Sequence, residues 1–460
     1  MSITKAQYRL APSKNARWYE GNKMGASINP NRLAALSLIG CLSQTASALT
    51  LQVMGDFDVA VETTDGDLQK SELVLTPRMD FDLPESVRAT VIARGRFDAA
   101  DELSPGQPPQ NSRSEWNRRV YLGDHGDLEL REAYIDGFAG DVFVRLGKQQ
   151  VVWGQADGLR VLDVLNPIDY REFILPDLDE RRIPLWMLNA EAPLWEGTLQ
   201  VVAVPDQTYD ELPPFDGAFG VSSRLLVPKA PDGVPVTIND PDRPDSPLQD
   251  ADAGARWQAF VGGWDVSLNY LYHYHDQAVY YLNERPGRIV VSPTYERTHL
   301  AGATFSNAFG DFALRGEIGY STDRYWVADP SSIANGVAES PELAYVIGLD
   351  YSGFSDTFFS IQAFQSYLTD HAPGVIRDSL ETQLTLRIRH LIWNQALGLE
   401  AFFIQSANDA DGLLQLEANY QFRSDLVGRV GADLFFGDKS GLFGQFQEAN
   451  RINIGLAYSF

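Results

Sequence analysis

Residues 379–392 read Ser-Leu-Glu-Thr-Gln-Leu-Thr-Leu-Arg-Ile-Arg-His-Leu-Ile. Even-numbered positions, from Leu380 to Ile392, are mostly apolar, whereas odd-numbered positions up to Arg389 are polar or charged. A period of two places successive side chains on opposite faces of a β-strand. The stretch therefore predicts a strand with one apolar face and one charged face.

The same alternation recurs along the chain and is clear again in 265–275 and 412–422. It predicts 18 strands: 49–62, 71–82, 87–98, 127–137, 141–151, 185–194, 197–205, 251–262, 264–276, 294–308, 311–321, 343–353, 356–367, 379–392, 395–406, 412–422, 426–436 and 451–460. Short connections alternate with generally longer, polar ones, as in bacterial outer-membrane barrels. Strands of this length can cross a bilayer when tilted. We expect an all-β, transmembrane antiparallel β-barrel of 18 strands, with 16 strands as the alternative.

Composition excludes several other classes. The 460 residues carry a formal net charge of -25, which argues against a nucleic-acid partner because such proteins need a basic surface. No apolar run approaches the roughly 20 residues of a membrane helix. Cys41 is the single cysteine, so neither an intramolecular disulfide nor a cysteine-rich metal site can form.

The N-terminus has the organisation of a secretory signal. Six basic residues and one acid precede the apolar stretch 33–42, and the small residues Ala46-Ser47-Ala48 follow it. We therefore expect a signal peptide over 1–48, a barrel over 49–460 and a location in the bacterial outer membrane. An alternative is a lipobox, Leu38-Ile39-Gly40-Cys41, which would place a lipid on Cys41.

The C-terminus carries an assembly signal. Residues 453–460 read Asn-Ile-Gly-Leu-Ala-Tyr-Ser-Phe, with Gly455, Tyr458 and the terminal Phe460 at characteristic spacings. The pattern resembles the last-strand signal that the outer-membrane assembly machinery reads. That machinery is thus an expected partner, together with outer-membrane lipid and lipopolysaccharide.

The inward faces of the predicted strands are rich in arginine. A predicted pore-lining basic track consists of Arg88, Arg94, Arg96, Arg131, Arg145, Arg387 and Arg389. Such a track would attract anionic solutes, although a merely solvated, polar lumen is the alternative. Strand 127–137 departs from the pattern, because Glu132 and Asp136 fall on its apolar face.

The connection 152–184 is too apolar for a free surface loop, yet it carries many charges. We expect it to fold into the barrel with some helical turns and to narrow the pore. Its candidate constriction residues are Asp157, Arg160, Asp163, Asp169, Arg171 and Glu172. Its acids are expected to face the arginines of 87–98, 127–137 and 141–151. The alternative is a packed plug with no part in permeation.

The same region resembles a known family. Residues 147–154, Asp157-Gly158-Leu159, Asn166-Pro167 and Arg171-Glu172-Phe173 are similar to the central motif of an uncharacterised family of porin-like outer-membrane proteins, often encoded near RND-type exporters. The resemblance implies transport or envelope lipid traffic, an RND-type exporter system as a partner, and no catalytic residues.

These observations predict a porin-like channel for small anionic or amphipathic solutes. One alternative is a barrel partner of an RND-type exporter that handles hydrophobic or lipid-like cargo. Another is an outer-membrane barrel hydrolase, although no Gly-x-Ser-x-Gly motif is present. No cofactor is expected. His273 and His275 share a strand face but have no identifiable third ligand, so no metal site is predicted either.

Overall fold

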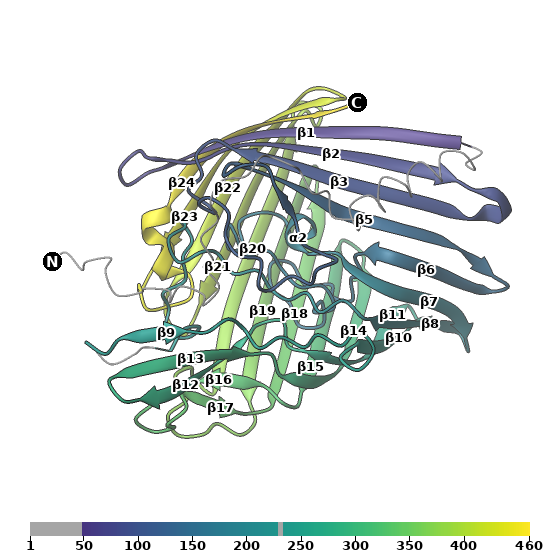
Figure 1. Cartoon of the computed structure of the whole chain (residues 1–460). Coiled ribbons are helices and arrows are strands. Elements are labelled where there is room, and N and C mark those ends of the chain that lie inside the picture. The colour runs from purple at the N-terminus through teal and green to yellow at the C-terminus, as the bar shows by residue number, and fades with distance from the viewer. Residues whose placement is uncertain (1–47, 229–232) are drawn as a thin grey trace, which may run out of the picture.

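The computed structural model describes residues 48–228 and 233–460, which form a closed antiparallel barrel (Figure 1). Its wall consists of 18 strands of the described chain: β1 (Ala48–Glu62), β2 (Leu68–Asp82), β3 (Arg88–Asp98), β5 (Gly126–Ala139), β6 (Val142–Gln149), β7 (Leu185–Leu194), β8 (Gly197–Val204), β10 (Asp252–Val261), β11 (Trp264–Tyr274), β14 (Arg297–Phe309), β15 (Phe312–Ser321), β18 (Glu342–Phe354), β19 (Thr357–Leu368), β20 (Leu380–Ile392), β21 (Leu397–Ser406), β22 (Gly412–Arg423), β23 (Leu426–Phe436) and β24 (Arg451–Ser459). β1 pairs with β24 from Met54↔Ser459 to Glu62↔Arg451 and closes the barrel.

The predicted strands are confirmed, with ends that differ by about three residues at most, and the 16-strand alternative is wrong. On β20, Leu384 and Leu386 are 46% and 39% exposed on the outer face, while Thr385 points inward and is buried. Leu268, Ile347 and other apolar residues continue this outer belt around the barrel. An apolar outer face and a polar lumen characterise barrels that lie in lipid.

A β-bulge explains the anomalous strand. Ile92 of β3 pairs with Glu132, but the next residue, Ala93, pairs with Leu130, so Arg131 is an extra residue in β5. One extra residue shifts the side-chain alternation by one position. Glu132 therefore faces the lumen, as does Asp136 beyond it, instead of lying against lipid.

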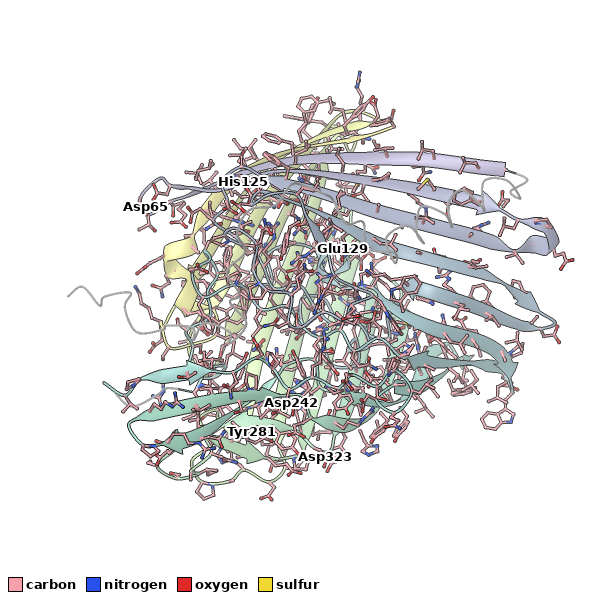
Figure 2. All side chains as sticks on the ribbon, in the orientation of Figure 1. Asp65, His125, Glu129, Asp242, Tyr281 and Asp323 are labelled. Carbon is pink, nitrogen blue, oxygen red and sulfur yellow. The ribbon has the colours of Figure 1, made fainter. Side chains whose placement is uncertain are left out.

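The long connections contain elements that the sequence analysis treated as loop. They are β4 (Val120–Tyr121), β9 (Val236–Ile238), β12 (Val279–Arg285), β13 (Arg288–Thr294), β16 (Tyr325–Val327) and β17 (Val337–Glu339). β9, β12 and β13 form a small sheet beside the barrel mouth, where Figure 2 labels Tyr281. Strands of two to seven residues in polar loops give too little alternation to be recognised from sequence.

Helices are few. The described chain has one α-helix, α2 (Leu178–Arg181), and two short 3₁₀ segments, η1 (Pro84–Ser86) and η2 (Gly444–Ala449). None of the described helices is long and apolar enough to cross a membrane. The expected signal peptide, apart from Ala48, and the lipobox at Cys41 lie outside the described residues.

Gly455 and Tyr458 of the expected assembly signal lie in β24, and Phe460 follows its last residue, Ser459. Gly455 faces the lumen, where an added Cβ would lie 2.0 Å from Oδ1 of Asp58, so a larger residue would displace the Asp58 carboxylate. Tyr458 and Phe460 lie at the end of the chain with ring centroids 5.6 Å apart. The Phe460 amide donates to the Val53 carbonyl at 3.0 Å and extends the pairing with β1.

Candidate functional site: the lumen and its inward segment

The chain leaves the wall after β6 and crosses the lumen before it returns as β7 (Figure 1). We call residues 150–184 the inward segment. Its first half packs on one wall, in a buried cluster that contains Trp153, Val161, Leu162 and Leu165 from the segment with Met187, Val202, Leu271, Leu300 and Val346 from the strands. Trp153 also donates its indole N–H to Oε1 of Gln200 at 2.8 Å.

The second half of the inward segment packs on the opposite wall. Phe173 has a positive φ of 53° and inserts its ring among aromatic side chains. Its ring centroid lies 4.6 Å from that of Phe446 and 6.2 Å from that of Phe435 on β23. The segment thus reaches from β7, β11 and β14 on one side to β21–β23 on the other.

Two glycines allow the segment to approach the walls. Gly158 has a φ of +76°, and a Cβ there would lie 2.7 Å from the ring of Phe402. Gly302 of β14 faces the segment, where a Cβ would lie 2.4 Å from Leu162. The inward segment therefore lies so close to the walls that a residue larger than glycine at either position would collide with Phe402 or Leu162.

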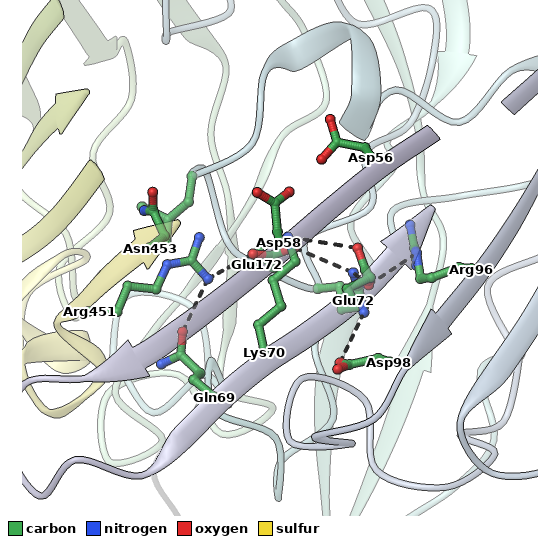
Figure 3. A network of polar contacts seen from close by, with 12 residues as sticks. Asp56, Asp58, Gln69, Lys70, Glu72, Arg96, Asp98, Glu172, Arg451 and Asn453 are labelled. Carbon is green, nitrogen blue, oxygen red and sulfur yellow. Dashed lines mark hydrogen bonds and ion pairs between the residues drawn. The ribbon is translucent and has the colours of Figure 1, made fainter. Parts of the chain in front are cut away.

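Ion pairs fix the centre of the segment, as Figure 3 shows. Glu172 accepts from Nζ of Lys70 at 2.9 Å and from Nη1 of Arg451 at 2.8 Å. The neighbouring Arg171 pairs with Glu72. Burial alone would raise the pKa of Glu172, but Lys70, Arg451 and Arg171 hold it well below its usual range. Glu172 is therefore a buried anion with two cationic partners from the wall.

The other three acidic constriction residues, Asp157, Asp163 and Asp169, also have cationic neighbours. Asp157 forms ion pairs with Arg315 and, at 3.7 Å, with Arg387. Asp163 lies 2.6 Å from Nη2 of Arg182 within the segment. Burial opposes ionisation of Asp169, yet Arg119 and the arginines around it lower its pKa to about 2.

Arg160 binds oxygen atoms of its own segment. It donates to the carbonyl of Asp163 at 3.1 Å and to the hydroxyl of Tyr170 at 3.3 Å. The constriction residues named from the sequence are thus brought together inside the barrel. Apart from short-range pairs, the ion-pair partners of their acids are Lys70, Arg119, Arg315, Arg387 and Arg451. Of the arginines on β3, β5 and β6 that the sequence suggested, Arg96 of β3 contributes by lowering the pKa of Asp169.

The predicted basic track faces the lumen, but each of its arginines lies within 4 Å of a carboxylate. The pairs are Arg88–Asp82 at 3.6 Å, Arg94–Glu129 at 2.5 Å, Arg96–Glu72 at 3.5 Å, Arg131–Glu129 at 3.9 Å, Arg145–Asp136 at 3.1 Å, Arg387–Glu400 at 3.2 Å and Arg389–Glu400 at 3.0 Å. Figure 2 labels Glu129 within this crowded interior. The lumen wall therefore presents mixed charge rather than an uninterrupted positive strip.

A second inward-folded connection, residues 99–125, was not recognised from the sequence. Its Arg113 is fully buried and donates to Glu129 at 3.1 Å and to Glu211 at 2.8 Å. Asn117 donates to the carbonyl of Pro184 at 2.9 Å. Arg113, Trp116 and Arg119 within an otherwise acidic, polar loop were the available signal.

A cavity of about 660 Å³ opens on the side of the short connections. Its lining includes Arg145, Gln150, Glu191, Gln200, Arg256 and Asp265. Val151 and Val152 of the inward segment also line it, so the segment forms part of the boundary of this vestibule. The vestibule therefore presents both signs of charge beside the inward segment.

A closed antiparallel barrel with an apolar outer belt, a charged lumen and an inward-folded connection defines the class of porin-type outer-membrane β-barrels. Within that class, the chain belongs to the DUF1302 family of proteins of unknown function, whose model matches residues 61–460. The family resemblance noted in the sequence is thereby confirmed. The association of that family with RND-type exporters stays a prediction.

Solved porins share the fold at low sequence identity. OccAB2 of Acinetobacter baumannii superposes with a TM-score of 0.53 and 9% identity over 90% of this chain and 98% of that one. OccK1 (OpdK) of Pseudomonas aeruginosa gives a TM-score of 0.50 and 11% identity over 90% and 99%. No curated protein matches the sequence. These likenesses show the fold.

Proposed function

We propose that this protein is an outer-membrane channel that passes small anionic or amphipathic solutes through a lumen narrowed by the inward segment. The observation that supports the proposal is the seating of that segment against both walls, with Leu162 on one side and Phe173 on the other. A path between the two faces of the membrane must run past it. The luminal arginines offer binding groups for anions along that path.

The mixed charge of the wall suggests selective rather than general permeation. Because every arginine of the predicted track has a carboxylate neighbour, an entering anion competes with Glu129 or Glu400 for the guanidinium groups. Solutes that carry a carboxylate or phosphate can form bidentate hydrogen bonds with arginine. Simple monovalent ions gain less from such sites.

Conductance in planar bilayers tests the channel. The wild-type protein is compared with a deletion of 158–178, and folding of both is checked by their heat-modifiable migration in gels. We expect small, steady conductance from the wild type and a clear increase from the deletion variant. Absence of conductance from both folded proteins would contradict the proposal.

Two other functions remain as alternatives with their own tests. Docking to an RND-type exporter that supplies hydrophobic or lipid-like cargo predicts co-purification of this protein with the exporter. An outer-membrane hydrolase predicts turnover of a chromogenic ester or peptide by the purified barrel. Either result in a protein without conductance would replace the channel proposal.

A further inference from the structure

The barrel wall has a break beside β5. β6 and β8 have 8 residues each and β7 has 10, whereas β5 has 14. A tilted strand needs about 9–11 residues to cross a bilayer. β6 pairs with β5 only from Ala133 onward, and the two-residue β4 pairs with Asp127 and Leu128. In the described chain no strand pairs with residues 129–132 on the edge of β5 that faces β6. We call this edge of β5, together with the start of β7 at Leu185, the seam.

A loop segment passes through the seam and closes it. Arg113 binds the luminal Glu129, whereas the carbonyl of Trp116 accepts the indole N–H of Trp186 at 3.3 Å. Trp186 shares the outer face of β7 with Leu188, which is 41% exposed. Residues 113–116 therefore run from the lumen to the outer face of the barrel.

The seam is held by side chains instead of a strand ladder. Nζ of Lys148 donates to the carbonyl of Leu130 at 2.5 Å, and Nδ2 of Asn117 donates to the carbonyl of Pro184 at 2.9 Å. A strand edge within a bilayer must be covered by protein or line a cavity, because lipid offers no hydrogen bonds. Displacement of residues 113–117 would therefore break side-chain contacts, such as those of Arg113 and Asn117, but no pairing between wall strands.

Buried guanidinium groups lie on the luminal side of the seam. Arg94, Arg113, Arg119 and Arg131 are all less than 9% exposed. Each has a nitrogen with no hydrogen-bond partner among the described residues: Nε of Arg94, Nη2 of Arg113, Nε of Arg119 and Nη1 of Arg131. Buried donors are normally satisfied, and carboxylate or phosphate oxygens are the acceptors that arginine binds most strongly.

The two sides of the seam thus differ in chemistry. On the luminal side, Arg94, Arg113 and Arg131 surround Glu129, and each keeps one donor nitrogen without an acceptor among the described residues. On the outer side lie Trp116, which is 52% exposed, and Trp186. Tryptophan favours the boundary between lipid and water. An anionic head group fits the first environment, and an alkyl chain fits the second.

We propose that the seam is a lateral binding site for single-chain anionic amphiphiles, which pass between the lumen and the membrane beside Trp116. The head group binds among Arg94, Arg113 and Arg131, and the tail lies between β5 and β7. This inference deepens the proposed function, because it names the amphipathic solute and gives it a route into lipid. It does not require the central path past the inward segment to conduct ions.

The test is binding of radiolabelled dodecanoate to the protein in lipid nanodiscs, with empty nanodiscs subtracted. One variant carries Trp116→Cys and Trp186→Cys, bridged by a cleavable bis-maleimide. A matched control carries Trp195→Cys and Trp257→Cys, whose rings lie 6.3 Å apart beside the β7–β8 connection. All variants also carry Cys41→Ser.

We expect the seam bridge to lower dodecanoate binding at least tenfold, cleavage of the bridge to restore it, and the control bridge to leave it unchanged. Dodecyl phosphate should displace dodecanoate if any anionic head is accepted, and fail to do so if the site selects carboxylates. Dodecyltrimethylammonium should not compete in either case. Equal binding with the seam bridged and open, or equal competition by the cationic amphiphile, would overturn the inference.

A photocross-linking measurement guards against a bridge that distorts the protein. p-Benzoylphenylalanine in place of Trp116 should cross-link to labelled dodecanoate, and the same group in place of Trp195 should not. Conductance of the same preparations separates the two proposals. Conductance without dodecanoate binding refutes the lateral site alone, whereas binding without conductance refutes the channel and leaves the lateral site standing.

Discussion

Oε2 of Glu172 lies 2.8 Å from Nη1 of Arg451, although 279 residues separate the two along the chain. Arg451 is the first residue of β24 and pairs with Glu62 of β1, where the barrel closes. Arg451 therefore joins the last strand to the first and ties the inward segment to β24, while Lys70 ties the same segment to β2.

Glu172→Gln should destabilise the folded barrel strongly. The substitution leaves the buried cations Lys70 and Arg451 without their shared anion, and breaking a buried ion pair from one side costs about 3–5 kcal/mol. The free energy of unfolding in detergent micelles measures the loss. Glu448→Gln, which removes the exposed pair with Lys439, is the control and should change little.

Asp157→Asn should increase anion selectivity. Asp157 lies between Arg315 and Arg387, so its neutralisation leaves two luminal arginines with less compensation. We expect the reversal potential in a salt gradient to shift toward the anion, with unitary conductance changed by less than about twofold. An unchanged reversal potential would mean that ions do not pass this part of the lumen.

Phe173→Ala should loosen the far end of the inward segment. The ring packs against Phe435, Phe443 and Phe446, and removal of a buried phenylalanine typically costs about 3–5 kcal/mol. Because the β-barrel ladder does not depend on this contact, we expect a folded barrel with larger and noisier conductance. Leu248→Ala, at a side chain that is 90% exposed, should leave the current unchanged.

Asp276 should make stability depend on pH. Burial and the neighbouring Asp210 raise the pKa of Asp276 well above its ordinary value, although Arg160 opposes this. Burial also raises the pKa of Asp210, against the opposing charge of Arg160. Protonation of this pair thus favours the folded state. The contribution is full below the ordinary aspartic acid pKa of about 4 and is lost as the pH rises through the raised values.

Asp276→Asn removes one of these charges at every pH. The fall in thermal stability between pH 4 and pH 8 should therefore become shallower than in the wild type. Heat-modifiability midpoints over that range measure the effect, with Asp65→Asn in the β1–β2 connection as control. A variant whose midpoint declines with pH as steeply as the wild type would disprove the role of this pair.

Phe460→Ala should reduce the amount of protein in the outer membrane. If the assembly machinery reads the terminal aromatic residue, its loss slows insertion, and the unassembled chain is degraded. Quantitative blots of outer-membrane fractions are expected to show a severalfold decrease. Phe422→Ala removes another exposed aromatic ring near a strand end, and its level should match that of the wild type.

The wall could be predicted from sequence because its determinant is local. In β20, the outward Leu384 and Leu386 alternate with polar inward residues, and the lipid outside enforces that alternation at every strand. The bulge at Arg131 could not be predicted in the same way. A single extra residue is visible only when β5 is aligned with its partner β3.

The lumen was predictable in composition but not in pairing. The inward direction of Arg94 and Arg387 follows from the alternation, yet their partners, Glu129 and Glu400, depend on the register between neighbouring strands. The partners of Glu172 depend on contacts across the lumen. Arg113, Ser114 and Asn117 were missed because their burial rests on ion pairs and hydrogen bonds, which leave no apolar period in the sequence.

The pair Glu172–Arg451 also orders the events of folding. Arg451 reaches its place only when β24 has joined β1, so the middle of the inward segment lacks one of its two cations until the barrel has closed. Contacts between residues so distant in sequence form late, because the chain between them must first be ordered. The complete set of cations around Glu172 therefore exists only in the closed barrel, so closure of the wall and the final seating of the inward segment are coupled.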